Sequence, residues 1–310
     1  MKIYIIPVPS ELQPKSVGIK RPPHNRDYGV EQDFLKYLKR NPQLLARSAE
    51  EADYHYLPIF WVRLYKKRFL KEKCASKELI KEFDKAVRKL IINDAITFTV
   101  CQYAGMDQQL SKQNIQLGKT VLLSPCRRER EGNIIDIPLL SSPHRQVITK
   151  RAKKYKACFN GNFETHPLRV EMAEKLSHKE DILIKEYQDD PSRYLRWIVG
   201  RTFVQNILSS YVSLCPRGTS ASSYRFYESM QLGVTPCFIG DMDVRPFKDR
   251  IDWDSFSFFV NSIDQLEDLL NQINKQETIE MGKRAYLCWR DQLRYQKWCS
   301  LALEQLNNIN

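Results

Sequence analysis

Short apolar runs alternate with amphipathic stretches along the whole chain. An apolar run ended by Gly, Pro or Asp is typical of a buried strand, whereas apolar residues spaced three and four apart are typical of a helix. On this basis we expect strands at 3–8, 51–60, 96–100, 120–123, 133–138, 157–162, 182–187, 211–214, 237–239 and 256–260. Strands that alternate with helical segments predict the α/β class with parallel sheets.

Helices are predicted between most of these strands. In the first, 28–39, the apolar residues Val30, Phe34 and Leu38 share one face, and Pro42 follows as a stop signal. Thr165 ahead of a proline is a start signal for a second helix. The further helices are expected from Pro167 onward and at 191–208, 224–232, 263–273 and 277–306.

The stretch 210–241 combines a strand, a loop, a helix and a second strand. Ser222 or Ser223 is a good N-cap for the helix, and Gly233 is a natural C′ residue. Such a unit directs backbone N–H groups and the positive end of the helix at a ligand over the sheet edge, a position that suits phosphate. Arg225 and Glu228 share a face of this helix. Arginine for phosphate and carboxylate for sugar hydroxyls are what a nucleotide-sugar site requires.

Net charge is the one unusual feature of the composition. The chain has 42% hydrophobic and 28% charged residues, which is ordinary, but a net charge of +12. This charge indicates an acidic partner, such as nucleic acid, an anionic membrane surface, or a phosphorylated or uronic-acid-bearing substrate. The basic stretch 62–90 is either a solvated helix face or a docking surface for an anionic acceptor or a membrane. The cluster within 145–156 is either a simple interdomain linker or a device that steers anions.

Cysteine usage and targeting signals favour the cytoplasm. The eight cysteines show no C-x-x-C or zinc-type spacing, so we expect reduced thiols rather than disulfides. No 18-residue apolar stretch exists, and the apolar run after Met1 is too short for a signal peptide.

The organising stretch resembles the donor-binding segment of exostosin-type glycosyltransferases. The resemblance is carried, in order, by Leu214-Cys-Pro-Arg-Gly218, Ser223-Tyr-Arg225, Glu228, Gly233-Val-Thr-Pro236, Asp241, Arg245-Pro-Phe247 and Ile251-Asp-Trp253. It implies an inverting enzyme with a nucleotide-sugar donor, usually UDP-linked, and the GT-B fold, in which two Rossmann-like doubly wound domains face each other across a cleft. Animal and plant exostosins usually carry an N-terminal membrane anchor, whereas this chain starts on its first strand. We therefore expect a soluble cytoplasmic protein of bacterial or viral origin.

The resemblance also implies a domain division and a set of donor contacts. We expect an acceptor-binding domain at 1–150, a nucleotide-sugar-binding domain at 151–282, and a C-terminal helix at 283–310 that packs back on the first domain. Glu228 would hold the ribose hydroxyls, Arg225 and Arg169 the diphosphate, and the 214–218 backbone the base. The full set of expected donor-binding residues is Gly161, Arg169, Leu214, Cys215, Pro216, Arg217, Gly218, Ser222, Ser223, Arg225, Glu228 and Asp241.

The reaction is expected to need no metal. Asp241-Met-Asp243 has the form of a metal-binding pair, but it coincides with the family's position for a single Asp, and we interpret it as a cleft loop. Helix N-termini and the cations Arg169, Arg217 and Arg225 would then receive the charge of the leaving diphosphate.

A general base is expected from the N-terminal domain. Glu31 matches the family's glutamate in the Tyr-x-x-Glu-x-x-Phe helix and is our first choice, although a structural carboxylate is an alternative reading. Asp27 and His24 follow, and His55 is more simply a structural strand histidine. The family's His-Asp pair after strand 96–100 is replaced here by Gln102-Tyr-Ala-Gly105, so an acceptor role of that pair is not carried over to this chain.

The sequence therefore predicts an inverting, metal-independent glycosyltransferase of glycan synthesis. It would move a hexosyl or pentosyl group from a UDP-sugar to a carbohydrate hydroxyl. An anionic or lipid-linked acceptor and a peripheral contact with a membrane are both compatible with the sequence. Two alternatives stay open. The first is a basic nucleic-acid-binding protein, although the sequence contains no recognised nucleic-acid-binding motif. The second is an inactive homologue that binds carbohydrate, although the presence of both Arg225 and Glu228 argues against it.

Overall fold

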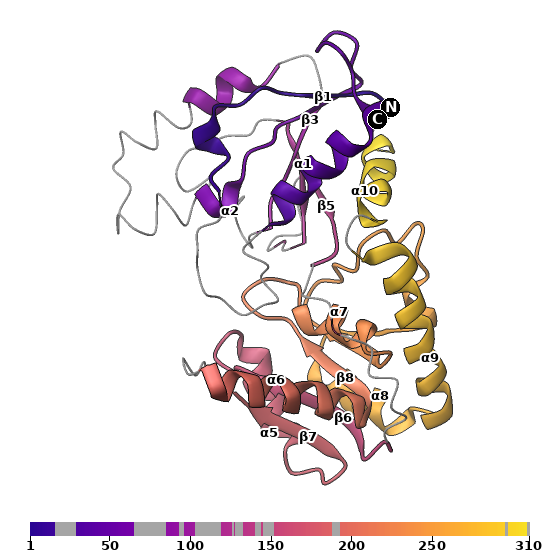
Figure 1. The fold of residues 1–310 in the computed structure, drawn as a ribbon. Coiled ribbons are helices and arrows are strands. Elements are labelled where there is room, and N and C mark those ends of the chain that lie inside the picture. The colour runs from indigo at the N-terminus through magenta and orange to yellow at the C-terminus, as the bar shows by residue number, and fades with distance from the viewer. Residues whose placement is uncertain are drawn as a thin grey trace. The chain divides into compact units, whose positions relative to one another are not determined.

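The computed structural model describes residues 1–15, 29–64, 85–92, 96–102, 119–125, 127, 133–139, 144, 152–187, 193–294 and 297–308. By their contacts these residues form two compact units. Unit 1 comprises Met1–Ser142 with Tyr295–Asn310, and unit 2 comprises Pro143–Arg294. Each unit is built on a parallel sheet of five strands, which confirms the predicted α/β class and its division into two sheet-based units (Figure 1). The division falls at 142/143 and 294/295, whereas the sequence suggested 150/151 and 282/283.

The sheet of unit 1 runs in chain order. Its strands are β1 (Ile3–Ile5), β2 (Tyr54–Tyr56), β3 (Ile96–Val100), β4 (Val121–Ser124) and β5 (Ile134–Asp136). β1 and β2 are shorter than predicted, because Pro7, Pro9 and Pro58 offer no N–H to a strand ladder. The short helices of this unit are η1 (Ser10–Leu12), η3 (Pro42–Leu44) and α2 (Trp61–Leu64).

Two longer helices pack within unit 1. In α1 (Val30–Arg40) the predicted apolar face is buried, and the chain turns into η3 at Pro42 as expected. Helix α10 (Lys297–Asn307) belongs to the C-terminal tail. Its Trp298 is 0% exposed and stacks on Phe34 of α1 with ring centroids 5.7 Å apart. The Tyr54 hydroxyl of β2 donates to the Leu306 carbonyl at 3.5 Å. The tail thus supplies an apolar wall for the first sheet.

Unit 2 has the strand order β10-β9-β8-β6-β7. Its strands are β6 (Tyr155–Gly161), β7 (Ile182–Glu186), β8 (Ser210–Pro216), β9 (Thr235–Ile239) and β10 (Phe258–Val260). Its helices are α5 (Pro167–Leu176), α6 (Arg193–Leu208), α7 (Tyr224–Gln231), α8 (Ile263–Gln272) and α9 (Lys275–Cys288), with a 3₁₀ turn η5 (Trp253–Ser255) and a π-helical turn η6 (Trp289–Leu293).

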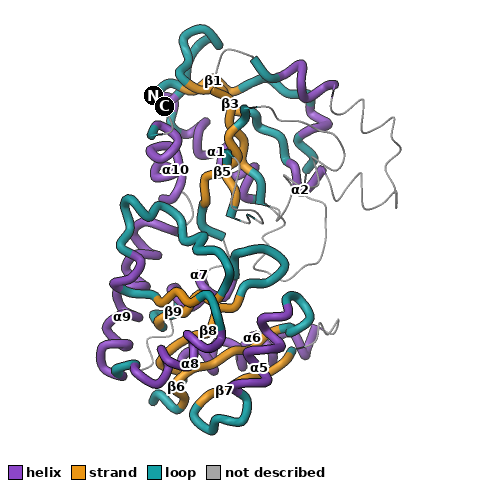
Figure 2. Tube along the Cα trace, turned by 180° about the vertical axis from the view of Figure 1, so that it is seen from behind, coloured by secondary structure: helices purple, strands orange, loops and turns teal. Residues whose placement is uncertain are grey.

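Helices cover both faces of this sheet (Figure 2). Met172 of α5 and Leu266 of α8 share one core with the strands, whereas Ile207 of α6 packs with Leu232 and Val234 on another. Gly233 has φ +68°, as its predicted C′ position requires. One start signal differs from expectation: α5 is capped by His166 and not by Thr165, because the His166 Nδ1 accepts from the Leu168 N–H at 3.2 Å.

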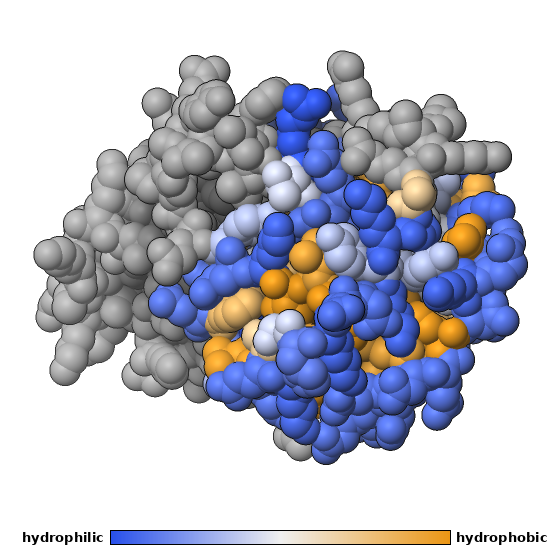
Figure 3. Space-filling view, turned by 90° about the horizontal axis from the view of Figure 1, so that it is seen from below, coloured by the Kyte–Doolittle hydropathy of each residue, from blue (hydrophilic) through white to orange (hydrophobic). Residues whose placement is uncertain are grey.

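On the face shown in Figure 3, the described residues are mainly hydrophilic, and apolar residues gather among them near the middle of that face. Two lysines of the predicted basic linker have structural partners. Lys153 Nζ donates to the Ser210 carbonyl at 2.7 Å, and Lys156 pairs with Asp181 at 2.9 Å. Residues 65–84 of the basic stretch lie outside the described residues. No helix in the described part of the chain is both long and apolar enough to cross a bilayer.

Candidate functional site

The strand order of unit 2 creates a topological switch point. The chain leaves β6 for β7 on one side and later returns to β8 on the other side of β6. In open parallel sheets, ligands bind outside the carboxyl ends of the two strands that part in this way. Here those ends are Gly161 of β6 and Pro216 of β8. We call these ends and the loops that follow them the β6/β8 edge.

Four of the predicted donor-binding residues meet at the β6/β8 edge. A Cβ on Gly161 would lie 3.6 Å from Nη2 of Arg225, and one on Gly218 would lie 3.2 Å from Nη2 of Arg169. Gly218 therefore leaves room for the Arg169 guanidinium, whereas a Cβ at Gly161 would first meet the Phe159 ring, 2.9 Å away, over which the Arg225 guanidinium lies. The predicted set thus comes together from α5, α7 and the ends of two strands.

Arg225 is a buried cation at this edge. It is only 6% exposed, and its guanidinium carbon lies 4.8 Å from the ring centroid of Phe159 and 4.5 Å from that of Phe203. Burial lowers its pKa below the ordinary arginine value. Its Nη1 is buried and has no hydrogen-bond partner among the described residues. Such a group retains a donor for an anionic ligand.

Arg169 has a different environment. Its Nε donates to the Arg217 carbonyl at 3.0 Å, its Nη2 to the Pro216 carbonyl at 3.1 Å, and its Nη1 to the Asn162 carbonyl at 2.8 Å. Burial first, and then the charge of Arg225, lower the pKa of Arg169 to about 10. The guanidinium thus ties the loop after β6 to the loop after β8. These hydrogen bonds indicate that Arg169 holds the two loops together, in addition to its predicted contact with the diphosphate.

Arg217 and Asp241 form an ion pair at the same edge. Burial opposes ionisation of Asp241, but the hydrogen bond and the charge of Arg217 outweigh it and hold the pKa of Asp241 below its usual value. His166 lies close to both residues, and its pKa is lowered by burial and by the charge of Arg217. A neutral ring whose Nδ1 accepts from Leu168 carries its proton on Nε2. His166 is therefore a neutral donor beside this ion pair.

Glu228 lies one turn after Arg225 on α7 and is 8% exposed. Its Oε1 is 3.2 Å from Nε2 of His144. The charge of Glu228 opposes, without overcoming, the lowering of the Arg225 pKa by burial, so the two groups lie within electrostatic reach. The predicted Arg225/Glu228 pair is thus present at the opening of α7.

The remaining predicted residues supply backbone or small side chains. Leu214 and Cys215 are buried in β8, and burial raises the pKa of the Cys215 thiol to about 12, so this thiol is inert. Ser222 and Ser223 are both buried just before α7, and the Ser223 side chain makes no capping hydrogen bond. The Pro216 carbonyl is engaged by Arg169. The Ser223 side chain therefore does not cap α7, and the Phe226 N–H donates to the Ser223 carbonyl at 3.2 Å instead.

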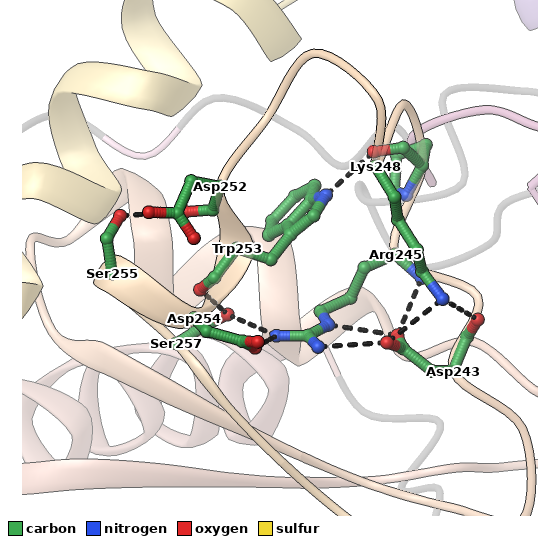
Figure 4. Close-up of polar contacts among 9 residues, drawn as sticks. Asp243, Arg245, Lys248, Asp252, Trp253, Asp254, Ser255 and Ser257 are labelled. Atoms are coloured by element: carbon green, nitrogen blue, oxygen red, sulfur yellow. Dashed lines mark hydrogen bonds and ion pairs between the residues drawn. The ribbon is translucent and has the colours of Figure 1, made fainter.

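Asp243 is held by basic side chains (Figure 4). Arg245 binds it with two parallel hydrogen bonds of 2.9 Å, and Lys248 Nζ lies 3.0 Å from its Oδ2. Arg245 also pairs with Asp254 at 3.0 Å and donates to the Ser257 hydroxyl at 3.1 Å. The two aspartates of Asp241-Met-Asp243 are thus engaged by different arginines.

Glu31, the first candidate base, lies in unit 1 at the start of α1 and is 0% exposed. Its carboxylate accepts from the backbone N–H of Val62 at 3.4 Å and from that of Gln102 at 3.2 Å. These donors follow β2 and β3, so the carboxylate ties together three segments at the carboxyl end of the first sheet. Burial raises its pKa to about 8, against the lowering effect of these hydrogen bonds.

The other base candidates divide in two. Asp27 and His24 lie outside the described residues. His55 is buried in β2, its Nε2 lies 2.9 Å from the Ala49 carbonyl, and its ring packs edge-on against Tyr4. These contacts support the interpretation of His55 as a structural residue of the strand.

Sequence reasoning missed three aromatic side chains and a capping histidine at the β6/β8 edge. Phe159 lies in the predicted strand 157–162, two residues before the expected donor residue Gly161, so its place near the site could have been inferred. Phe203 and His144 come from segments with no signal of their own, and only the folded chain brings them to α7. His166 was masked by the stronger start signal of Thr165.

Comparisons with known proteins bear on the family of the chain. The sequence model of the Exostosin GT47 domain matches residues 1–275. Exostosin-1 of Drosophila melanogaster is 26% identical over 157 residues, which is 44% of this chain and 20% of that protein. The Exostosin-1 homolog of Caenorhabditis elegans is 29% identical over 123 residues, which is 37% of this chain and 31% of that protein. The matched stretches thus span less than a third of these relatives.

Among solved structures, the crystal structure of Anabaena Alr3699/HepE in complex with UDP-glucose is similar over 99% of this chain and 100% of that one, with a TM-score of 0.41 and 9% identity.

Proposed function

The chain belongs to the exostosin GT47 family, and from this premise we propose that it is an inverting glycosyltransferase that moves a hexosyl or pentosyl group from a UDP-linked donor to a carbohydrate hydroxyl. The observation that carries the proposal is Arg225. A buried guanidinium held between two aromatic rings, with Nη1 lacking a partner among the described residues, stands where an open parallel sheet binds its ligand. A diphosphate supplies the charge and the acceptors that this cation lacks.

Different residues at the β6/β8 edge would bind different parts of the donor. Arg225 and the N-terminus of α7 would hold the diphosphate, and Glu228 would accept hydrogen bonds from the ribose hydroxyls. Arg169 would keep the loops after β6 and β8 at the right separation through its three backbone contacts. The 214–218 backbone would then border the base.

Inversion requires one displacement at the anomeric carbon. The acceptor hydroxyl would lose its proton to a general base and form the new glycosidic bond while the bond to the departing diphosphate breaks. Arg225 and the helix N-terminus would stabilise the charge that develops on the diphosphate, so the reaction would proceed without a metal ion. Glu31 is the first candidate base, with Asp27 and His24 next.

The test begins with nucleotide binding. UDP at about a hundredfold excess over its Kd should stabilise the protein by about 2.7 kcal/mol in a thermal unfolding assay, and other nucleoside diphosphates should stabilise it less. Arg225→Gln should weaken UDP binding at least tenfold, because it removes the charge that meets the diphosphate. Arg284→Gln is the matched control, since Arg284 is an exposed arginine of the same unit.

Product analysis tests the reaction itself. The anomeric configuration of the product, read by NMR from a UDP-sugar that the binding panel selects, should be opposite to that of the donor. Equal UDP affinity in Arg225→Gln and the parent would refute the site, and a product of unchanged configuration would refute inversion.

A further inference from the structure

His144 contacts helix α7 although the two lie far apart in the sequence. Its backbone N–H donates to Oε1 of Gln231 at 2.8 Å, and its Nε2 lies 3.2 Å from Oε1 of Glu228. Glu228 and Gln231 are three residues apart on α7 and so share a helix face. One residue at the start of unit 2 is thus attached at two points to the face of α7 that carries Glu228.

The ring of His144 also has an aromatic partner. It stacks on Phe203 of α6 with centroids 6.4 Å apart and an interplanar angle of 26°. Phe203 in turn contacts the guanidinium of Arg225. His144 therefore touches Glu228 directly and Arg225 through one ring, which are the two side chains assigned to the nucleotide.

The chemistry of the contact fixes its direction. An ionised carboxylate only accepts hydrogen bonds, so Nε2 of His144 is the donor to Glu228. This bond restricts the rotation of the carboxylate, while its oxygens keep further lone pairs for other donors. A carboxylate oriented in advance binds a ligand hydroxyl without paying the full entropy of ordering.

We propose that His144 is a positioning residue of the nucleotide site, which orients the Glu228 carboxylate toward the ribose hydroxyls of the donor. The inference rests on the proposed function, because it requires that Glu228 meets a ribose. It goes beyond that function in giving the site a specificity determinant from the segment that precedes β6.

Two variants separate the hydrogen bond from the stack. His144→Phe keeps a ring for Phe203 but has no donor for Glu228, whereas His144→Gln keeps an N–H donor but loses the ring. The probes are UDP, 2′,3′-dideoxyuridine diphosphate and inorganic pyrophosphate, each titrated against the full chain by calorimetry. The dideoxy compound lacks the hydroxyls that Glu228 would bind, and pyrophosphate lacks the nucleoside altogether.

We expect the parent to bind UDP more tightly than the dideoxy compound. His144→Phe should weaken UDP binding about tenfold and leave the other two affinities within about twofold of the parent. His144→Gln should retain most of the preference for UDP. Adding His144→Phe to Glu228→Ala should cause no further loss, because the first acts only through the second.

Several results would overturn the inference. They are an unchanged preference for UDP in His144→Phe, an equal loss for all three probes, and a loss in His144→Gln as large as in His144→Phe. A parent that binds UDP and the dideoxy compound equally would also refute it while leaving the proposed function standing. A parent that binds no nucleoside diphosphate would refute the proposed function and this inference with it.

Discussion

The buried carboxyl group of Glu31 can contribute to stability and to catalysis, and measurements at different pH values separate these two roles. The perturbation is Glu31→Gln, which keeps an oxygen to accept from the N–H groups of Val62 and Gln102 but removes the ionisable proton. The pKa of Glu31 is raised from 4.5 to about 8 in the folded protein. Between these values the folded state holds a proton that the unfolded state has lost.

The sign and size of the effect follow from linkage. Because the folded state binds more protons, the free energy of unfolding falls as pH rises through this window, by up to about 1.4 kcal/mol per pH unit. The stability contributed by protonated Glu31 is complete below pH 4.5 and is lost as pH passes about 8. Between pH 5 and pH 7 the loss is about 2–3 kcal/mol. Glu31→Gln lacks this loss, so its stability relative to the parent should rise by that amount.

The assay is urea unfolding of both proteins from pH 5 to pH 8, followed by tryptophan fluorescence. Trp61 and Trp298 are buried in unit 1 and report on the unit that contains Glu31. The other titrating groups are common to the two proteins, so their difference isolates Glu31. Parallel curves for the parent and Glu31→Gln would refute the raised pKa.

The same variant tests catalysis. A general base works only when ionised, and with a pKa of about 8 roughly a tenth of Glu31 is ionised at pH 7. If Glu31 is the base, the transfer rate should rise about tenfold per pH unit below pH 8, and Glu31→Gln should lose about 10²–10⁴-fold in rate with UDP affinity unchanged. Transfer at near the parent rate would leave Glu31 as a brace and pass the role to Asp27 or His24.

Three further predictions concern unit 2. Arg169→Lys keeps the charge but cannot donate to three carbonyls, so it should lower Tm and weaken UDP binding, whereas an unchanged Tm would exclude the bracing role. Arg245→Met leaves Asp243 and Asp254 without their arginine and should cost about 3 kcal/mol in urea unfolding, with Arg245→Lys recovering part of it; a cost below about 1 kcal/mol would show that the network is not a stabilising one. Transfer should persist in EDTA, and complete loss with rescue by Mn²⁺ would return Asp241 and Asp243 to the metal-ligand candidates.

Local signals explain which parts of the fold were predictable. The bounds of β3 match the expected 96–100, and α7 ends within a residue of expectation, because a buried apolar run and the C′ glycine Gly233 each act over a few residues. β1 and β2 were predicted too long because the apolar runs include prolines. A proline has no N–H to donate to a neighbouring strand, so the strand ends before it although the run stays apolar. The His166 cap was missed because histidine is a weaker capping signal than the neighbouring Thr165.

The sequence predicted which residues form the candidate site but not which role each of them has. The sequence places three arginines near one sheet edge, yet which of them faces a ligand depends on tertiary partners. The Arg169 guanidinium meets three carbonyls, and that of Arg217 meets Asp241. Only the folded chain shows that Arg225 has aromatic faces around it and a buried Nη1 without a partner among the described residues.

This division has an electrostatic consequence. Cations buried together repel one another, as the effect of Arg225 on the pKa of Arg169 shows. Carbonyl dipoles compensate the positive charge of Arg169, and the Asp241 carboxylate compensates that of Arg217. The carboxylate near Arg225 is Glu228, which also forms a hydrogen bond with His144. The least compensated charge therefore lies at the switch point. A diphosphate bound there would relieve the burial cost of Arg225 as well as form new hydrogen bonds, so anion binding and the stability of unit 2 should rise together.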